Sequence, residues 1–195
     1  MLYFKNVDMD KNIRKIEEMY ENSFIEREKF PFTVLVSASN KDGITFQSIY
    51  NDENLIGMLF TIQDGKILFV LYLLINSEYQ NEGYGGQVMD MLHEKYRNCD
   101  IILNIEAVQE GLPNSEARLK RQEFFTKHGL NKLNLYFIDK DMAYEIMCTN
   151  INREVNEKLF YDLLNKMLNP ALMIMLKLRK FKVLPYIPKK EVRSK

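Results

Sequence analysis

The chain has 195 residues, enough for one domain with a sizeable hydrophobic core. Its hydrophobic content of 46% and charged content of 28% are ordinary for a soluble globular protein, which argues against a disordered or fibrous chain. Basic and acidic residues balance at 27 each, so no overall positive field points to nucleic acid as a partner.

The N-terminal part is predicted to begin with a strand over residues 2–7. Apolar side chains then recur at helical spacing over residues 11–24, and Asp10 precedes them as a candidate cap. The helical pattern breaks over residues 23–32. We therefore expect an aromatic loop there, ending in Phe30-Pro31-Phe32.

Three strands in succession are predicted over residues 44–50, 55–63 and 67–75. Asp64-Gly65 separates the second from the third and is a strong hairpin signal. The third strand is apolar at almost every position, so we expect both of its faces to be buried in the middle of a sheet.

The pattern changes to helical spacing after Gly86, and strands and helices alternate from there. We expect a helix from about residue 85 to residues 97–98, a strand at 101–107, a helix at 115–128, and strands at 133–138 and 143–149. The order predicts an α/β (α+β) domain with a mixed sheet.

Residues 151–195 differ from the rest and are predicted to be a helical, basic C-terminal extension of a domain that spans residues 1–150. Residues 152–168 are amphipathic, and a second segment covers 171–183. From Lys177 to Lys195 there are eight Lys or Arg and one Glu. This tail is open to several interpretations: a solvated terminus, a membrane-surface helix, a lid, or an arm of a homodimer. We favour packing on the body or on a second subunit.

The two cysteines, Cys99 and Cys148, have neither metal-binding nor redox spacing, so we expect no metal and a reducing, cytoplasmic location. The start of the chain lacks a basic leader followed by an apolar stretch, and we expect no signal peptide. The longest apolar runs fall far short of the ~20 residues of a membrane-spanning helix.

The chemistry is expected at the turn between the strand at 67–75 and the next helix. Gly83, Gly85 and Gly86 let the backbone approach a ligand, and amides at a helix N-terminus suit a pyrophosphate. The spacing does not fit the dinucleotide fingerprint, and the Gly-Lys-Ser/Thr ending of a Walker A loop is absent. Glycines alone are a weak signal, because a flexible loop also uses them.

This turn resembles the coenzyme A loop of the GNAT acetyltransferase superfamily, whose pattern is Gln/Arg-x-x-Gly-x-Gly/Ala. Gln80, Gly83 and Gly85 match it. A later family motif resembles the stretch that runs from Asn114 and Ala117 through Phe124-Phe125 to His128-Gly129-Leu130. The resemblance covers roughly residues 1–150. It implies a mostly antiparallel, strongly twisted central sheet flanked by helices.

The resemblance also implies a site for acetyl-CoA as cosubstrate. The pantetheine arm is expected on Leu73, Leu74 and Ile75, where the fourth strand splays from the fifth. Asn114 and Phe125 are expected near it. The pyrophosphate is expected on the turn formed by Gln80, Asn81, Glu82, Gly83, Tyr84, Gly85 and Gly86. The acceptor is then a primary amine of a small molecule or peptide, which attacks the thioester directly.

Two departures from the family pattern affect catalysis. Phe125 replaces the tyrosine that often acts as general acid, and the fourth strand has no carboxylate to act as base. We therefore consider Glu106 and Tyr72 as catalytic residues, with His128 as a further candidate. Each has a structural alternative: a solvated strand end for Glu106, core packing for Tyr72 and a helix terminus for His128.

The substrate side is expected to include Phe24 and Phe30 from the aromatic loop, together with Glu106; simple packing of these rings is the alternative. Three classes of function follow. The first is an acetyl-CoA-dependent N-acetyltransferase. The second is a catalytically weak or inactive coenzyme A-binding sensor or scaffold, which Phe125 keeps open. A protein that interacts through its basic tail is a third class.

Overall fold

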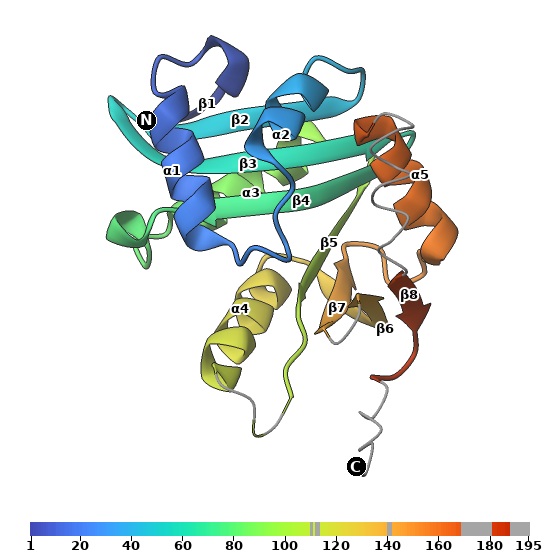
Figure 1. Ribbon diagram of the computed structural model, residues 1–195. Helices are drawn as coiled ribbons and strands as arrows, with labels where there is room; N and C mark the ends of the chain where they lie inside the picture. The colour runs from blue at the N-terminus through green and yellow to red at the C-terminus, as the bar shows by residue number, and fades with distance from the viewer. Residues whose placement is uncertain (110, 112–113, 140–141, 169–180, 188–195) are drawn as a thin grey trace, which may run out of the picture.

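The computed structural model describes residues 1–109, 111, 114–139, 142–168 and 181–187. Figure 1 shows one mixed sheet with helices packed against it. The strands are β1 Leu2–Asn6, β2 Ile44–Asn51, β3 Asn54–Asp64, β4 Ile67–Ile75, β5 Asp100–Glu106, β6 Asn131–Asp139, β7 Met142–Cys148 and β8 Phe181–Leu184. The helices are α1 Ile13–Ser23, α2 Phe32–Ala38, α3 Tyr84–Lys95, α4 Ser115–Lys127 and α5 Glu157–Met167, with short 3-10 turns at Val7–Met9 and Ser77–Tyr79.

The eight described strands form one sheet in the order β1-β2-β3-β4-β5-β7-β6-β8. Neighbours are antiparallel except for β4 and β5, which are parallel. The predicted mixed, mostly antiparallel sheet is confirmed, as is the interior position of the strand at 67–75. The Asp64-Gly65 hairpin is confirmed too, since Asp64 pairs with Ile67 across it.

The pairing of β4 with β5 stops halfway along β4. It runs from Ile67 opposite Asp100 to Val70 opposite Leu103, and no further. On the other edge of β4, Val70 pairs with Thr61 and Tyr72 pairs with Phe60, so Leu71 is an extra residue in a bulge. A bulge bends its strand and raises the local twist. The second half of β4 therefore leaves β5, and the sheet opens between them.

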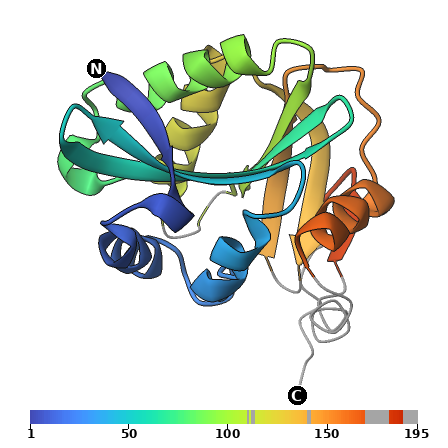
Figure 2. The same cartoon turned by 90° about the horizontal axis from the view of Figure 1, so that it is seen from above.

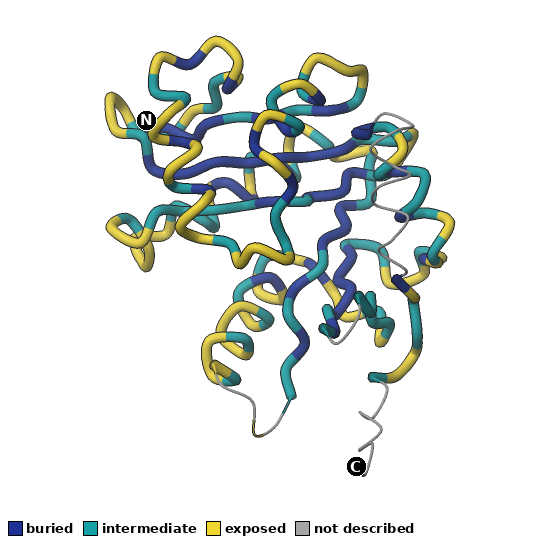
Figure 3. Tube along the Cα trace, viewed as in Figure 1, coloured by how far each residue is buried: buried dark blue, intermediate teal, exposed yellow. Residues whose placement is uncertain are grey.

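The helices cover both faces of the sheet. Figure 2 shows α1 and α2 on one face and α3 with α4 on the other, while α5 covers the end of the first face beside β6 and β8. Each face has its own apolar core. The first is built around Tyr20, Phe60 and Phe160, and the second around Leu59 and Met89. The strands carry most of the buried positions (Figure 3).

Helix α2 was not predicted, because its Val-rich sequence has low helical propensity. It forms because Phe32, Leu35 and Ala38 fall on one face and are all buried. The expected cap at Asp10 is also corrected. Helix α1 begins at Ile13 with Asn12 as its N-cap residue. The Asp10 carboxylate instead accepts hydrogen bonds from Ser48 and Tyr50 in the interior, as well as from the Asn12 amide.

The C-terminal extension is helical only in part. Helix α5 lies within the predicted segment at 152–168, but residues 181–184 form strand β8, which pairs with β6. This corrects the expectation of a wholly helical extension. The rest of the segment at 171–183, and most of the basic tail, lie outside the described residues. None of the described helices has the length and apolarity needed to cross a membrane.

Candidate functional site

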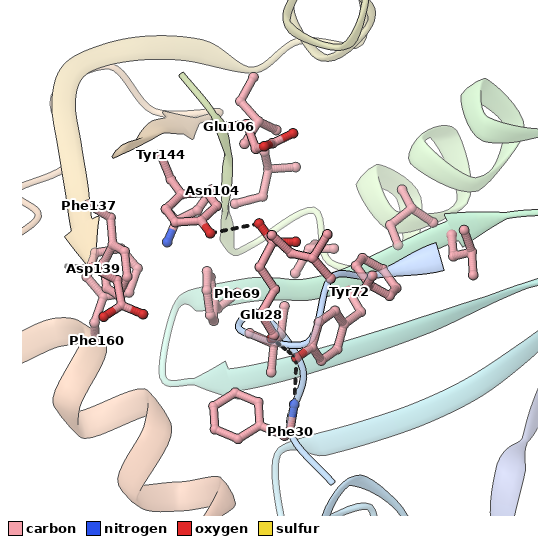
Figure 4. A pocket seen from close by; sticks show the side chains of 18 of the residues that line it. Glu28, Phe30, Phe69, Tyr72, Asn104, Glu106, Phe137, Asp139, Tyr144 and Phe160 are labelled. Carbon is pink, nitrogen blue, oxygen red and sulfur yellow. Dashed lines mark hydrogen bonds between the residues drawn. The ribbon is translucent and has the colours of Figure 1, made fainter. Parts of the chain in front are cut away.

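A cavity of about 570 Å³ lies where β4 and β5 separate. Its walls come from the loop after α1, from β4, β5, β6 and β7, from α4, and from the C-terminal elements α5 and β8 (Figure 4). Most of its lining is apolar or aromatic. The charged side chains that line it are Arg27, Glu28, Glu106, Arg121 and Asp139.

The loop between α1 and α2 is held by two buried tyrosines, Tyr20 of α1 and Tyr72 of β4. The Tyr72 hydroxyl donates to the Glu28 backbone oxygen at 2.6 Å and accepts from the Phe30 amide at 3.3 Å. The Tyr20 hydroxyl donates to the Phe30 backbone oxygen at 2.9 Å and accepts from the same amide at 2.9 Å. The Phe24 ring packs on Tyr72 with 4.8 Å between centroids. These contacts hold the backbone of Glu28 at the cavity wall.

Glu28 directs its carboxylate into the cavity, where the Tyr144 hydroxyl donates to Oε1 at 2.7 Å (Figure 4). Burial raises the pKa of the Glu28 carboxyl above its ordinary value, although the Tyr144 hydrogen bond opposes the rise. Burial, together with the Glu28 carboxylate, also raises the pKa of the Tyr144 phenol, so it stays protonated. A carboxylate with raised basicity beside a cavity is suited to accept a proton.

Glu106 lies at the end of β5, at the rim of the cavity, and is engaged by two arginines. Arg118 donates to Oε1 at 2.9 Å and Arg121 to Oε2 at 3.4 Å. Arg118 also donates to the backbone oxygen of Ala107. Its side chain is only 12% exposed, against 25% for Glu106, so this pair is partly shielded from water. The pairing ties β5 to α4.

The glycine turn leads into α3, whose first turn includes Gly85 and Gly86. Gly83 has φ of 84° and is the N-cap residue, and no described heavy atom lies within 4 Å of the position that a Cβ would take there. The first amide of α3 to bond within the helix is that of Gln87, to Gly83. The amides of residues 84–86 therefore precede the hydrogen-bonded turns, as at any helix N-terminus, and can face an anion.

Gly85 and Gly86 have a second role that the sequence does not reveal. A Cβ on Gly85 would lie 3.1 Å from the Phe124 ring, and one on Gly86 would lie 2.6 Å from His128 Nε2. Both glycines thus allow the start of α3 to pack against the end of α4. His128 in turn bonds through Nδ1 to the Phe124 backbone oxygen at 2.8 Å, consistent with a structural role at the helix terminus.

Most of the predicted site residues lie on the cavity. They are Phe24, Phe30, Tyr72, Leu73, Leu74, Ile75, Gln80, Glu106 and Phe125. Gln80 lines the cavity and donates from Nε2 to the Ile75 backbone oxygen at 2.8 Å. The other turn residues, Asn81 to Gly86, do not line it.

Tyr84 and Asn114 lie apart from the cavity. The Tyr84 hydroxyl accepts a hydrogen bond from the Asn51 side chain at 2.9 Å. Asn114 is the N-cap residue of α4, in a separate shallow depression with Lys120. Gly85 and Gly86 contact the C-terminal end of α4, whereas Asn114 lies at its N-terminal end. The two ends are about 20 Å apart, because α4 has 13 residues.

Sequence reasoning missed several polar and aromatic residues of the cavity. They are Glu28, Asn104, Phe137, Asp139, Tyr144, Phe160 and Phe181. A signal existed for Glu28, a carboxylate in the middle of the aromatic loop. The others meet through the pairing of β5, β6, β7 and β8 and the packing of α5 on these strands, which no local pattern specifies.

Comparison with known proteins agrees with this geometry. The sequence model of the Acetyltransferase (GNAT) family matches residues 11–129. The chain belongs to the GNAT family. No curated protein matches the sequence. Membership in this family supports acyl transfer as the general reaction.

Solved structures show the same fold at low sequence identity. A protein described as a GNAT-family acetyltransferase from Bacteroides thetaiotaomicron is 17% identical, with a TM-score of 0.60 over 90% of this chain and 95% of that one. An aminoglycoside 6'-N-acetyltransferase complexed with coenzyme A is 13% identical, with a TM-score of 0.58 over 78% and 99%. The PaiA N-acetyltransferase of Thermoplasma acidophilum, also in complex with coenzyme A, is 16% identical, with a TM-score of 0.52 over 77% and 99%. At these identities the likeness shows the fold alone.

Within the described ranges, no group of three or more His, Cys, Asp or Glu side chains is arranged to hold a metal ion.

Proposed function

We propose that this GNAT protein transfers an acetyl group from acetyl-CoA to a primary amine. The observation that carries the proposal is the Glu28–Tyr144 pair in the cavity at the opening between β4 and β5. It places a carboxylate of raised pKa where the family fold opens its sheet. That carboxylate supplies the base that β4 lacks.

The residues of the glycine turn and β4 fit coenzyme A. The open space around Gly83, at the start of α3, admits a pyrophosphate against free amides. Leu73, Leu74 and Ile75 follow the last β4–β5 pair, so their edge of β4 is not paired with β5. These residues would hold the pantetheine arm. The bound cosubstrate supplies an acetyl group activated as a thioester.

The residues of the chain then act on the acceptor amine. Glu28 takes a proton from the amine, directly or through one water, and leaves it neutral and nucleophilic. Tyr144 keeps the carboxylate oriented by its 2.7 Å hydrogen bond. Tyr72 fixes the backbone of Glu28, so we assign it a positioning role in place of the expected catalytic one.

Glu106 retains a second role in this proposal. Its ion pairs with Arg118 and Arg121 hold it at the cavity rim and offset its negative charge, so we expect it to shape the entrance to the acceptor cavity rather than to attract a cation. Phe125 cannot donate a proton. We expect the leaving thiolate to depart as an anion or to take its proton from water.

The test is a panel of primary amines with acetyl-CoA, monitored by release of free thiol, beside calorimetry with coenzyme A. Acetyl transfer to at least one amine, lowered roughly 100-fold or more in Glu28→Gln, supports the proposal. Tight binding of coenzyme A without transfer to any amine would favour the alternative function, a sensor or scaffold. Phe125 keeps this alternative open, because it replaces the tyrosine that often acts as general acid in the family. A homodimer through the C-terminal extension remains a prediction that sedimentation can test.

A further inference from the structure

We propose that the acceptor is an extended dication, a compound like an α,ω-diamine with its reactive amine at Glu28 and a second cationic group at Asp139. This inference rests on the proposed function, because it assigns the acceptor of the same cavity. It is carried by features of the cavity end opposite Tyr72, which the transfer reaction itself does not use.

Asp139 is the last residue of β6 and lines this end of the cavity. Its Oδ1 atom is buried and has no hydrogen-bond partner in the part of the chain that the structure describes. A buried carboxylate oxygen without a donor is costly, and native proteins rarely leave one unsatisfied. A donor from a bound ligand would satisfy it, and an ammonium group is the donor with matching charge.

Aromatic rings surround the same position. Phe137 lies two residues before Asp139 on β6 and thus on the same face of the sheet. Phe181 of β8 pairs with Asp139 directly and stacks on Phe137 at 4.6 Å between centroids. The Phe160 ring of α5 is 5.0 Å from that of Phe137. Figure 4 shows Asp139 beside Phe137 and Phe160. Ring faces attract organic cations, so the carboxylate and the rings favour the same class of ligand.

The spacing of the two polar ends suits an aliphatic linker. Phe137 lies opposite Tyr144, which holds Glu28, and Asp139 lies two residues further along β6. Two residues of strand span about 7 Å. Phe69 and Phe160, whose rings are 5.5 Å apart, line the same cavity and offer an apolar wall to a linker.

The charges of the cavity disfavour acceptors with a free carboxylate. Among the described residues of the lining, Glu106 is neutralised by its ion pairs with Arg118 and Arg121, whereas Glu28 and Asp139 have no ion pair with a described residue. Arg27, the other described arginine of the lining, has its own partner. A simple monoamine would leave Asp139 without a donor, whereas a diamine satisfies both ends.

The test is calorimetry of the full chain, with and without coenzyme A, using pentane-1,5-diamine and n-pentylamine as probes. We expect the diamine to bind the wild type about tenfold or more tightly than the monoamine, the gain from one added charge-assisted contact. Asp139→Asn should remove that preference and leave monoamine affinity unchanged. Asp139→Glu should retain it. Asp90→Asn, the same change at an exposed position of α3, should have no effect.

Equal affinities of the two probes for the wild type would overturn the inference, as would the absence of binding by either. An equal loss of both affinities in Asp139→Asn would also overturn it, because that result assigns Asp139 a structural role only. The titration does not depend on turnover. A protein that prefers the diamine but transfers no acetyl group would contradict the proposed function, and the cavity would then be a binding site for a dication and not an acceptor site.

Discussion

The Tyr144 hydroxyl donates a 2.7 Å hydrogen bond to Glu28, although 116 residues separate them in the chain. Tyr144 lies on β7, and Glu28 lies in the loop between α1 and α2. The contact closes one side of the cavity and joins the N-terminal and C-terminal halves of the domain across the opening in the sheet. The base of the proposed reaction is therefore made by the tertiary structure, and several measurements can test its consequences.

Glu28→Gln should lower acetyl transfer by roughly 100-fold or more, the usual contribution of a general base, with unchanged affinity for coenzyme A. Stability at neutral pH should not fall. Burial raises the pKa of Glu28 in the folded state, so the fold disfavours the charged carboxylate. The stability that the protonated Glu28 contributes is therefore lost as pH rises through this raised pKa. Gln removes this penalty and keeps an acceptor for Tyr144.

Steady-state rates and a thermal melt of the same variant provide the measurements. Glu26→Gln is the matched control, since Glu26 is two residues away and its side chain is 94% exposed. Equal rates in Glu28→Gln and the wild type would remove Glu28 from the mechanism.

Tyr144→Phe should move the acidic limb of the pH–rate profile to higher pH. The Tyr144 hydrogen bond stabilises the Glu28 carboxylate, so its loss raises the pKa of Glu28 further. Glu28 must be ionised to accept a proton, and activity below the raised pKa is lost. The measurement is kcat/KM against pH. Tyr136→Phe, on the neighbouring strand, should leave the limb in place, and an unmoved limb in Tyr144→Phe would argue against Glu28 as the titrating base.

Gly83→Asp should abolish coenzyme A binding through negative charge against the pyrophosphate. Gly65→Asp is the matched control. Both Gly83 and Gly65 have positive φ and open space around them, so each substitution carries a similar backbone strain of about 1–2 kcal/mol, but Gly65 lies outside the turn at the start of α3. Calorimetry with coenzyme A should find undiminished affinity in Gly65→Asp only. Gly85→Asp is a poorer probe, because its side chain also collides with Phe124. Retained affinity in Gly83→Asp would show that the turn does not hold the cosubstrate.

Glu106→Gln should destabilise the fold by about 1–3 kcal/mol, because Arg118 loses its charged partner in a partly buried site. We also expect activity to fall more than coenzyme A affinity does. Urea unfolding measures the first effect and rates per folded protein the second. Glu116→Gln, which breaks the exposed pair with Lys120, should change stability little. A rate that follows only the folded fraction would limit Glu106 to a structural role.

Phe181→Ala should cost about 3 kcal/mol or more of stability, because a buried ring is removed from the core shared by β8, α5 and β6. Tyr186→Ala, at a ring that is 60% exposed, is the control. Urea unfolding of both variants provides the measurement. An unchanged transition in Phe181→Ala would indicate that the extension after residue 150 is separable from the domain.

Local patterns sufficed for most strands, because alternation and apolar runs report which faces are buried. They failed at α2, where burial of Phe32, Leu35 and Ala38 overrides weak propensity, and at β8, which exists through its pairing with β6. The glycine turn at the start of α3 was found because its glycines and the strand before it are contiguous in sequence. Leu73 and Ile75 were predicted for the same reason, since they end the strand just before the turn, and both line the cavity.

The polar groups inside the cavity could not be found this way. Glu28, Asp139 and Tyr144 come from three separate segments, and none carries a motif. Local sequence patterns are sufficient for the family, the order of most elements and the turn at the start of α3, since each depends on residues close together in the chain. Which carboxylates face the cavity depends on long-range contacts: the bulge at Leu71, the register of β6 with β7 and β8, and the hydroxyl of Tyr72 that holds the Glu28 backbone.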